Sequence, residues 1–205
     1  MDFIFNMICS SEYIKRKDIN KKDNRLKSEC NYSDPNSIEN QTKEPGLSSI
    51  YGTIVAIEPV YSSDNKGEFE YFNVTIQTET LQHVHFLLTP KTYFVDCIMS
   101  KKGQKVVGFY NASLPMPLIY PPSYQIEVIA LNLTGRSVKA DFYNCFLISR
   151  DNQIQLQISN NTYIINQNGK PYCENISNKY MIALYSESTK SMPAITIPSV
   201  LIVLK

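Results

Sequence analysis

The fold of this chain is decided by residues 106–131, VVGFYNASLPMPLIYPPSYQIEVIAL, whose pattern returns at residues 181–205 as MIALYSESTKSMPAITIPSVLIVLK. In both stretches an apolar run ends in a tyrosine, Tyr110 or Tyr185, and a loop that contains proline follows. A Pro-Ser pair then precedes a second apolar run. Such self-similarity is typical of repeated structural units, and the frequent Ile, Val and Tyr residues favour strands. The repeat therefore predicts two related β units in tandem.

The first unit is expected to contain five strands. Alternation is clearest at residues 69–79, where Phe72, Val74 and Ile76 share the face that should point inward. The expected strands are residues 51–60, 69–79, 81–90, 104–113 and 124–133, with a brief helix or loop at 92–103. This order resembles the small five-stranded Greek-key barrel called the OB fold. The predicted fold class is all-β, with two tandem OB-like barrel units.

The chain is expected to divide into three parts. Residues 1–48 form a predicted disordered N-terminal arm, because residues 10–48 are polar and charged and cannot bury enough apolar surface to offset the loss of chain entropy. Residues 49–133 form the first β-barrel unit, and residues 134–205 form the second, related unit. A second short repeat, TYFVD at 92–96 and TYIIN at 162–166, supports this division.

Charge argues against nucleic acid as the main ligand. The 205 residues carry a net charge of +1, and residues 50–133 contain five lysines and seven acidic residues, a balance of −2. A groove for single strands needs positive charge along the phosphate backbone. The alternative stays open, however, because Tyr71 lies on the face of its strand that is expected to be exposed. That alternative is an OB-like module for single-stranded nucleic acid or a small ligand.

No compartment is specified by the N-terminal residues. The apolar run from Phe3 to Cys9 is short, Asp2 stands where a signal peptide carries positive charge, and no stretch reaches the ~20 apolar residues of a spanning helix. Cytoplasmic localisation without membrane association is the default expectation, and deposition on a cell or spore surface stays open. Five widely spaced cysteines favour reduced thiols over a disulfide framework.

The residue patterns of enzymes are absent from the sequence. No nucleophile elbow, phosphate-binding loop or His-Glu-x-x-His motif is present. His83 and His85 share one strand face and could bind a metal with Asp96 or Cys97, but two solvent-facing imidazoles are the preferred interpretation. Glu68 and Glu70 also share a face, beside a turn. We therefore expect a non-enzymatic protein with no catalytic, cofactor-binding or metal-binding residues and no cofactor.

The candidate functional site is the proline-aromatic loop between the fourth and fifth strands. Proline cannot donate a ladder hydrogen bond, so this stretch should leave the sheet, and its rigid backbone should lower the entropy cost of docking. Its apolar side chains then either contact a partner or fold back to plug the barrel. The predicted protein-interaction residues are Leu114, Pro115, Pro117, Leu118, Ile119, Tyr120, Pro121, Pro122 and Tyr124. The expected function is that of a structural or protein-interaction protein, which could self-assemble through this loop and its counterpart at residues 188–199.

Three stretches also carry a family resemblance. TYFVD at 92–96, GFYNASLPMPLIYPPSY at 108–124 and IPSVLIVLK at 197–205 resemble a group of two-unit β proteins from low-GC Gram-positive bacteria. The resemblance spans roughly residues 50–205 and leaves out the first 48. It implies the same domain boundary and no particular activity.

Overall fold

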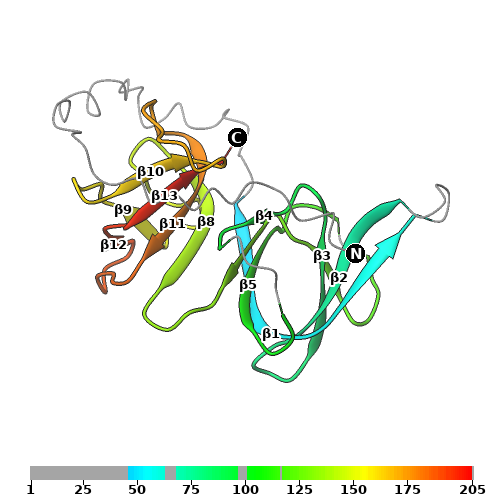
Figure 1. Cartoon of the computed structure of the whole chain (residues 1–205). Helices are drawn as coiled ribbons and strands as arrows, with labels where there is room; N and C mark the ends of the chain where they lie inside the picture. Colours follow the sequence, from blue (N-terminus) through cyan, green and yellow to red (C-terminus); the bar gives the residue numbers. More distant parts are fainter. Residues whose placement is uncertain (1–45, 63–67, 97–100, 116, 205) are drawn as a thin grey trace.

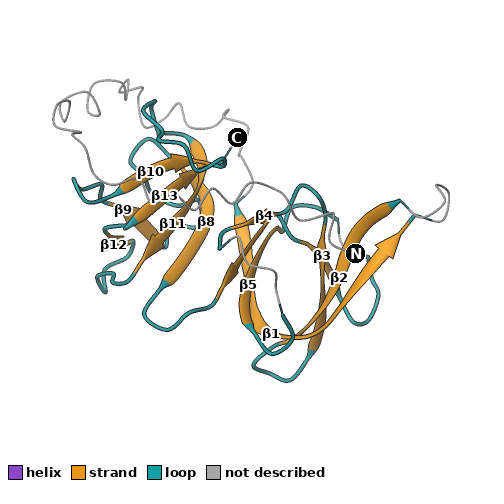
Figure 2. Ribbon diagram, viewed as in Figure 1, coloured by secondary structure: helices purple, strands orange, loops and turns teal. Residues whose placement is uncertain are grey.

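The computed structural model describes residues 46–62, 68–96, 101–115 and 117–204. These residues form strands, turns and loops, and none of them is in a helix (Figure 2). The strands are β1 (Leu47–Tyr61), β2 (Phe69–Gln77), β3 (His83–Leu88), β4 (Tyr93–Phe94), β5 (Lys105–Asn111), β6 (Ser123–Gln125), β7 (Val128–Leu131), β8 (Ser137–Tyr143), β9 (Ile154–Leu156), β10 (Tyr163–Asn166), β11 (Lys179–Tyr185), β12 (Ala194–Thr196) and β13 (Val200–Val203). The all-β prediction is confirmed.

The strands form three sheets in a solenoid-like stack (Figure 1), and the strands of the second and third sheets alternate along the chain. The first has seven strands in the order β4-β7-β5-β1-β2-β3-β6. The second has four, in the order β10-β13-β11-β8, and the third pairs β12 with β9. The first sheet takes in the described part of residues 47–131, and the other two take in residues 137–203.

The long strand β1 organises the first sheet because it pairs with two different neighbours. Its first half pairs with β5 through residues 47–53, and its second half pairs with β2 through residues 53–61. Gly52 lies where the partner changes. A Cβ at this position would come within 2.4 Å of the Ile76 side chain and 2.5 Å of the Gln77 carbonyl, so only glycine fits.

The expected fifth strand of the first unit is split in two. Strands β6 and β7 are separated only by Ile126 and Glu127, whose N–H groups donate to Leu87 O (3.1 Å) and Phe109 O (2.9 Å). Because β6 pairs parallel with β3 and β7 pairs antiparallel with β5, residues 123–131 connect opposite sides of the seven-stranded sheet. A core of buried side chains packs against the first sheet. Val74, Phe86 and Ile126 are among the most deeply buried.

The second half repeats the strand pairings of the first. Strand β10 pairs parallel with β13, β13 antiparallel with β11, and β11 antiparallel with β8, as β4, β7, β5 and β1 do. Strand β9 pairs parallel with β12, as β3 does with β6. No strand of the second half among the described residues corresponds to the long strand β2. Residues 148 and 149 take its place between β8 and β9, through the isolated bridges Tyr143–Ser149 and Ile148–Gln155.

Two local predictions differ from the structure. Leu47 and Ser48, which we assigned to the arm, belong to β1 and pair with Asn111 and Tyr110. Residues 92–96, expected as part of a brief helix or loop, contain the short strand β4 and a turn, because β4 finds a parallel partner in β7. The remainder of the arm, residues 1–45, lies outside the described residues, as do residues 97–100.

A shared apolar core joins the two halves of the chain. Leu47 is only 5% exposed, because it packs with side chains from both halves. The buried members of this shared core are Leu47, Val107, Phe109, Val128, Ala130, Val138, Ala140, Ile182 and Ile202. Removing this apolar surface from water stabilises the contact between the halves by the hydrophobic effect.

A buried carboxylate lies beside this shared core. Asp141 is fully buried, and its Oδ1 accepts hydrogen bonds from the N–H groups of Leu47 (3.1 Å) and Phe142 (2.9 Å). Its Oδ2 has no hydrogen-bond partner, and Lys139 Nζ lies 3.7 Å away. Burial raises the pKa of Asp141, although the two N–H groups and Lys139 partly oppose the rise. Asp141 therefore connects the start of β1 to the second half at an electrostatic cost.

We predict that Leu47→Ala destabilises both halves together. Truncating a buried leucine costs about 2–5 kcal/mol, and Leu47 contributes to a core that both halves share. Native-state hydrogen exchange should show equal losses of protection at Val74 in the first half and Leu201 in the second. Ile154→Ala is the control, since Ile154 packs only against side chains of the second half. If the Leu47→Ala variant lost protection only in the first half of the protein, this result would contradict a cooperative shared core.

The stability of the protein should also depend on the protonation of Asp141. A raised folded-state pKa contributes stability that is present below the unfolded pKa of ~4 and is lost as pH rises through the folded pKa. Asp141→Asn keeps an acceptor for the Leu47 N–H and removes the charge. We expect its free energy of unfolding, relative to that of the unchanged protein, to increase from about pH 4 to 7 in urea titrations.

Asp151 provides a control of opposite sign. Burial alone would raise its pKa, but hydrogen bonds from Lys139, Ser149 and the Gln153 N–H outweigh burial and lower the pKa. Its contribution to stability is therefore present above the unfolded pKa and is lost as pH falls through the folded pKa. The free energy of unfolding of Asp151→Asn should therefore be lower than that of the unchanged protein above the unfolded pKa, and this difference should disappear in acid. Identical pH profiles for the two asparagine variants would refute both assignments.

Candidate functional site

The proline-aromatic loop is held at both ends by the sheet. At its start, the side chain of Asn111 accepts a hydrogen bond from the Ser113 N–H (2.9 Å), which closes a turn directly after β5. At its end, the Pro122 carbonyl accepts a hydrogen bond from the His85 N–H (2.8 Å), and β6 then pairs with β3. Met116 lies outside the described residues. The loop is therefore a projection from two fixed strand ends.

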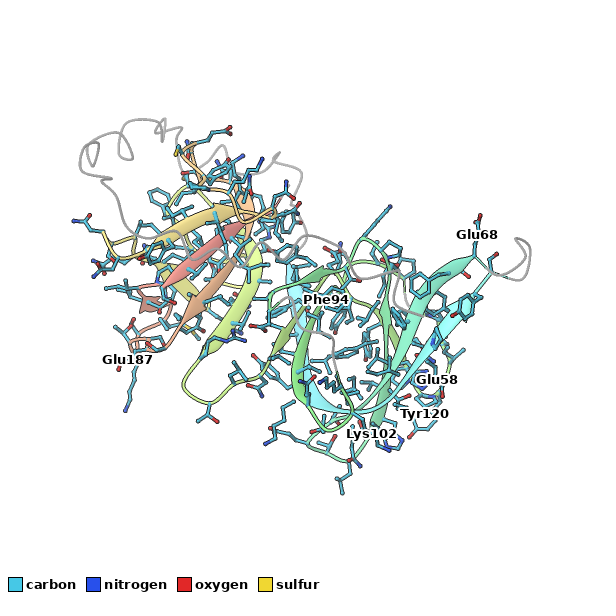
Figure 3. The ribbon with its side chains drawn as sticks, viewed as in Figure 1. Glu58, Glu68, Phe94, Lys102, Tyr120 and Glu187 are labelled. Atoms are coloured by element: carbon cyan, nitrogen blue, oxygen red, sulfur yellow. The ribbon has the colours of Figure 1, made fainter. Side chains whose placement is uncertain are left out.

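The apolar side chains in the middle of the loop face solvent. Leu118 is 105% exposed, Tyr120 86% and Ile119 57%, and Leu114 is also exposed. Figure 3 shows Tyr120 at the margin of the first sheet. A barrel plug would require these side chains to be buried, so their exposure favours the contact interpretation of the loop over the plug.

The last residue of the predicted interaction set behaves differently. Tyr124 is half-buried, packs against the core of the first sheet, and lies 4.7 Å from the Tyr110 ring, centroid to centroid. Burial raises the pKa of Tyr110, and Tyr124 adds to the rise, while a hydrogen bond with Ser48 opposes it. Pro121 and Pro122 are half-buried as well. The outward part of the loop thus consists of Leu114, Pro115 and residues 117–120.

A related loop lies between β11 and β12. Met192 is 84% exposed and precedes a cis peptide bond to Pro193, as Tyr120 precedes a cis bond to Pro121. Hydroxyl groups close this second loop, since the Thr189 Oγ1 accepts from the Ile195 N–H (2.8 Å) and lies 2.7 Å from the Ser191 Oγ. Each half therefore presents an exposed apolar side chain at an equivalent position in its strand order.

The histidine pair follows the strand alternation that we predicted. Val84 and Phe86 are buried, whereas His83 is exposed and His85 half-buried. Among the described residues, no group of three or more His, Cys, Asp or Glu side chains could hold a metal. Asp96, a possible third ligand, is occupied by Arg136, whose Nη2 lies 2.9 Å from Oδ2, and by the Leu131 N–H (2.7 Å). Cys97 lies outside the described residues.

Other groups with possible chemical roles are dispersed. Glu68 and Glu70 are both exposed at the start of β2, and Figure 3 shows Glu68 at the far end of the first sheet. Cys145 is half-buried and Cys173 is exposed. Within the described part of the chain, no helix is long and apolar enough to cross a membrane.

The face that could bind nucleic acid is formed by β2 and β3. Tyr71 and Asn73 are half-buried on it, and Glu58 lies opposite Asn73 on β1. Neither β1, β2 nor β3 contains a lysine or arginine. Phosphate backbones require cations at short range, so this face lacks the main source of affinity for single strands.

Comparison with known protein families, with curated proteins and with solved structures finds no match to this chain. The resemblance to two-unit β proteins of Gram-positive bacteria therefore stays a prediction from the three quoted stretches.

Proposed function

We propose that the protein is a non-enzymatic interaction or structural protein, and that it binds a protein partner or a second copy of itself through residues 117–120. The observation that carries this proposal is the exposure of three successive large apolar side chains, Leu118, Ile119 and Tyr120, on a loop anchored at both ends. Apolar surface that finds no place in its own core is a common mark of a contact site.

The energetics of such a contact are favourable. Fully burying one large apolar side chain contributes about 1.5–3 kcal/mol, and three lie next to one another here. Pro117 and Pro121 flank them and restrict the backbone, so less conformational entropy is lost on docking. Tyrosine at the tip adds a hydroxyl that can bond at the rim of an interface.

We further infer that the two halves derive from one duplicated β unit of the OB-like type. Support comes from the matched pairing directions and from a repeated hydrogen bond. The hydroxyls of Thr92 and Thr162 donate to Ile126 O (2.7 Å) and Pro198 O (2.8 Å), each just before the closing strand. The passage of residues 123–131 from β3 to β5 also agrees with the closure of a five-stranded Greek-key barrel. Duplication would supply two apolar loops, and so two contact points.

The alternative is an OB-like module for single-stranded nucleic acid or a small ligand. The strand order of the first half supports it, together with Tyr71 on the face of β2 and β3. The absence of lysine and arginine from β1, β2 and β3 weighs against nucleic acid. We therefore rank protein contact first.

The proposal is tested by the double change Ile119→Ser and Tyr120→Ser. Both side chains are exposed, so the melting temperature should shift by no more than about 2 °C. Association should be lost, as measured by light scattering for self-assembly and by photo-crosslinking from position 118 for a protein partner. Leu81→Ser is the matched control, since Leu81 is an exposed apolar residue outside the loop. A loss of several kcal/mol in stability with association intact would show that the loop serves its own fold.

A further inference from the structure

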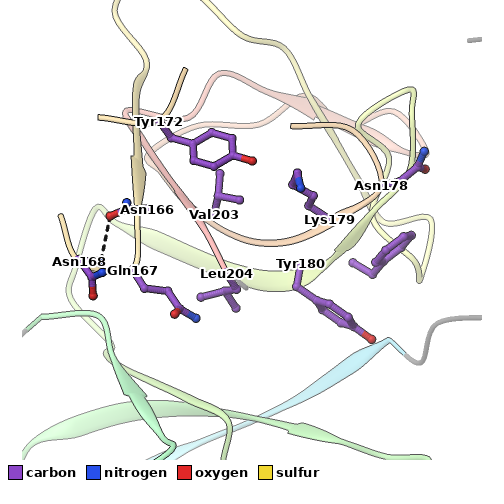
Figure 4. A pocket seen from close by; sticks show the side chains of 10 residues that line it. Asn166, Gln167, Asn168, Tyr172, Asn178, Lys179, Tyr180, Val203 and Leu204 are labelled. Atoms are coloured by element: carbon purple, nitrogen blue, oxygen red, sulfur yellow. Dashed lines mark hydrogen bonds between the residues drawn. The ribbon is translucent and has the colours of Figure 1, made fainter. Parts of the chain in front are cut away.

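A pocket of about 550 Å³ lies at one end of the four-stranded sheet, away from the proline-aromatic loop in sequence and in strand order. Residues at the ends of β10 and β13 and at the start of β11 line it (Figure 4). This volume falls within the range of ~300–1,000 Å³ that is usual for small-molecule sites. The size of the pocket thus suits one or two rings of a small ligand.

Aromatic rings form the apolar part of the pocket. Phe142 on β8 and Tyr180 on β11 are cross-strand partners, with ring centroids 5.4 Å apart at 72°. Tyr172 contributes a third ring, and its hydroxyl contacts Glu174 Oε2 at 3.2 Å. All three rings are half-buried, so they are held in place and still offer surface to a ligand.

Amide side chains form the polar part. Asn166 is used internally, because its Oδ1 accepts hydrogen bonds from the Asn168 N–H (2.9 Å) and the Lys170 N–H (3.0 Å) and so shapes the turn. The side chains of Gln167 and Asn178 make no hydrogen bond to another described residue, and both line the pocket. Figure 4 shows the two amides on opposite sides of the pocket, and each offers donors and an acceptor to a ligand group that itself both donates and accepts.

The charge of the lining narrows the ligand class. Among the described residues that line the pocket, Lys179 is the only lysine or arginine, and none is an aspartate or glutamate. A multiply charged phosphate ligand would ordinarily require several cations or a bidentate arginine. A cationic ligand would require a carboxylate. The lining therefore suits a ligand that is neutral and rich in hydrogen-bonding groups.

We propose that this pocket binds a neutral saccharide. Sugar hydroxyls donate and accept hydrogen bonds, which matches the free amides of Gln167 and Asn178. The C–H face of a sugar ring is apolar, which matches the exposed faces of the aromatic rings. This site is separate from the proline-aromatic loop and does not depend on the function proposed for it.

The experiment is a titration of the ¹⁵N-labelled full chain with maltose, cellobiose and chitobiose. Each sugar is added up to about 10 mM, because a single pocket that contributes only ~4 kcal/mol of binding free energy has a Kd near 1 mM. At least one disaccharide should cause saturable shifts at the amide signals of Gln167, Asn178 and Lys179. The variants Gln167→Ala and Asn178→Gly should each weaken binding about tenfold, as expected when one buried ligand hydroxyl loses its partner. Glycine is chosen at 178 because Asn178 has a φ of 56°.

Matched controls separate a local effect from unfolding. Gln153→Ala removes an exposed amide outside the pocket and should leave binding unchanged. The dispersed signals of Ile182 and Leu201, both buried in the sheet, report whether each variant is folded. The double variant at Ile119 and Tyr120 should still bind the sugar, so failure of the loop proposal would not affect this result. Absence of saturable shifts with all three sugars, or shifts that neither pocket variant alters, would overturn the proposal.

Discussion

The structure depends on the way in which β1 is held at both of its sides and at its first residue. One half of β1 pairs with β5 and the other half pairs with β2. Strand β1 therefore joins the strands on its two sides into one seven-stranded sheet. Its first residue, Leu47, is buried in the core that the two halves share and donates its N–H to Asp141. Two small β units with separate cores would be only marginally stable. The shared core enlarges the apolar surface that each of them buries.

Asp141 shows the electrostatic consequence of this packing. Its carboxylate satisfies two N–H groups, yet one oxygen has no hydrogen-bond partner and only Lys139 nearby. Lys139 also pairs with Asp151, so one cation is divided between two carboxylates. Removing the partner of a buried charge costs more free energy than the net free energy gained when the pair forms. The contact therefore holds the start of β1 beside β8.

The two candidate sites differ in the kind of surface that they present. The proline-aromatic loop exposes apolar side chains that project from fixed strand ends, which suits a flat or concave protein surface. The pocket at the end of the four-stranded sheet is concave and combines rings with amides, which suits a small polar molecule. A protein with both could bind a partner through the first half and a saccharide through the second.

Local patterns in the sequence were enough to predict the class of fold and the position of the loop. Alternation placed Val84 and Phe86 inside and His83 outside, because side chains of a strand point to opposite faces in turn. The four prolines of residues 115–122 placed that stretch outside the sheet, because proline has no N–H to donate. The repeat at residues 181–205 anticipated the matched strand pairings of the second half.

Tertiary structure alone decided which groups meet across long separations in the sequence. Alternation places Lys139 and Asp141 together on one face of β8, as if both faced water, but Leu47 and its neighbours cover Asp141. The pocket unites Phe142 with Tyr180 and Gln167 through strand register and sheet packing. Secondary structure follows from short-range periodicity, which the sequence contains directly. Burial of a charge and the shape of a pocket follow from contacts between distant segments, and these are set only when the sheets pack.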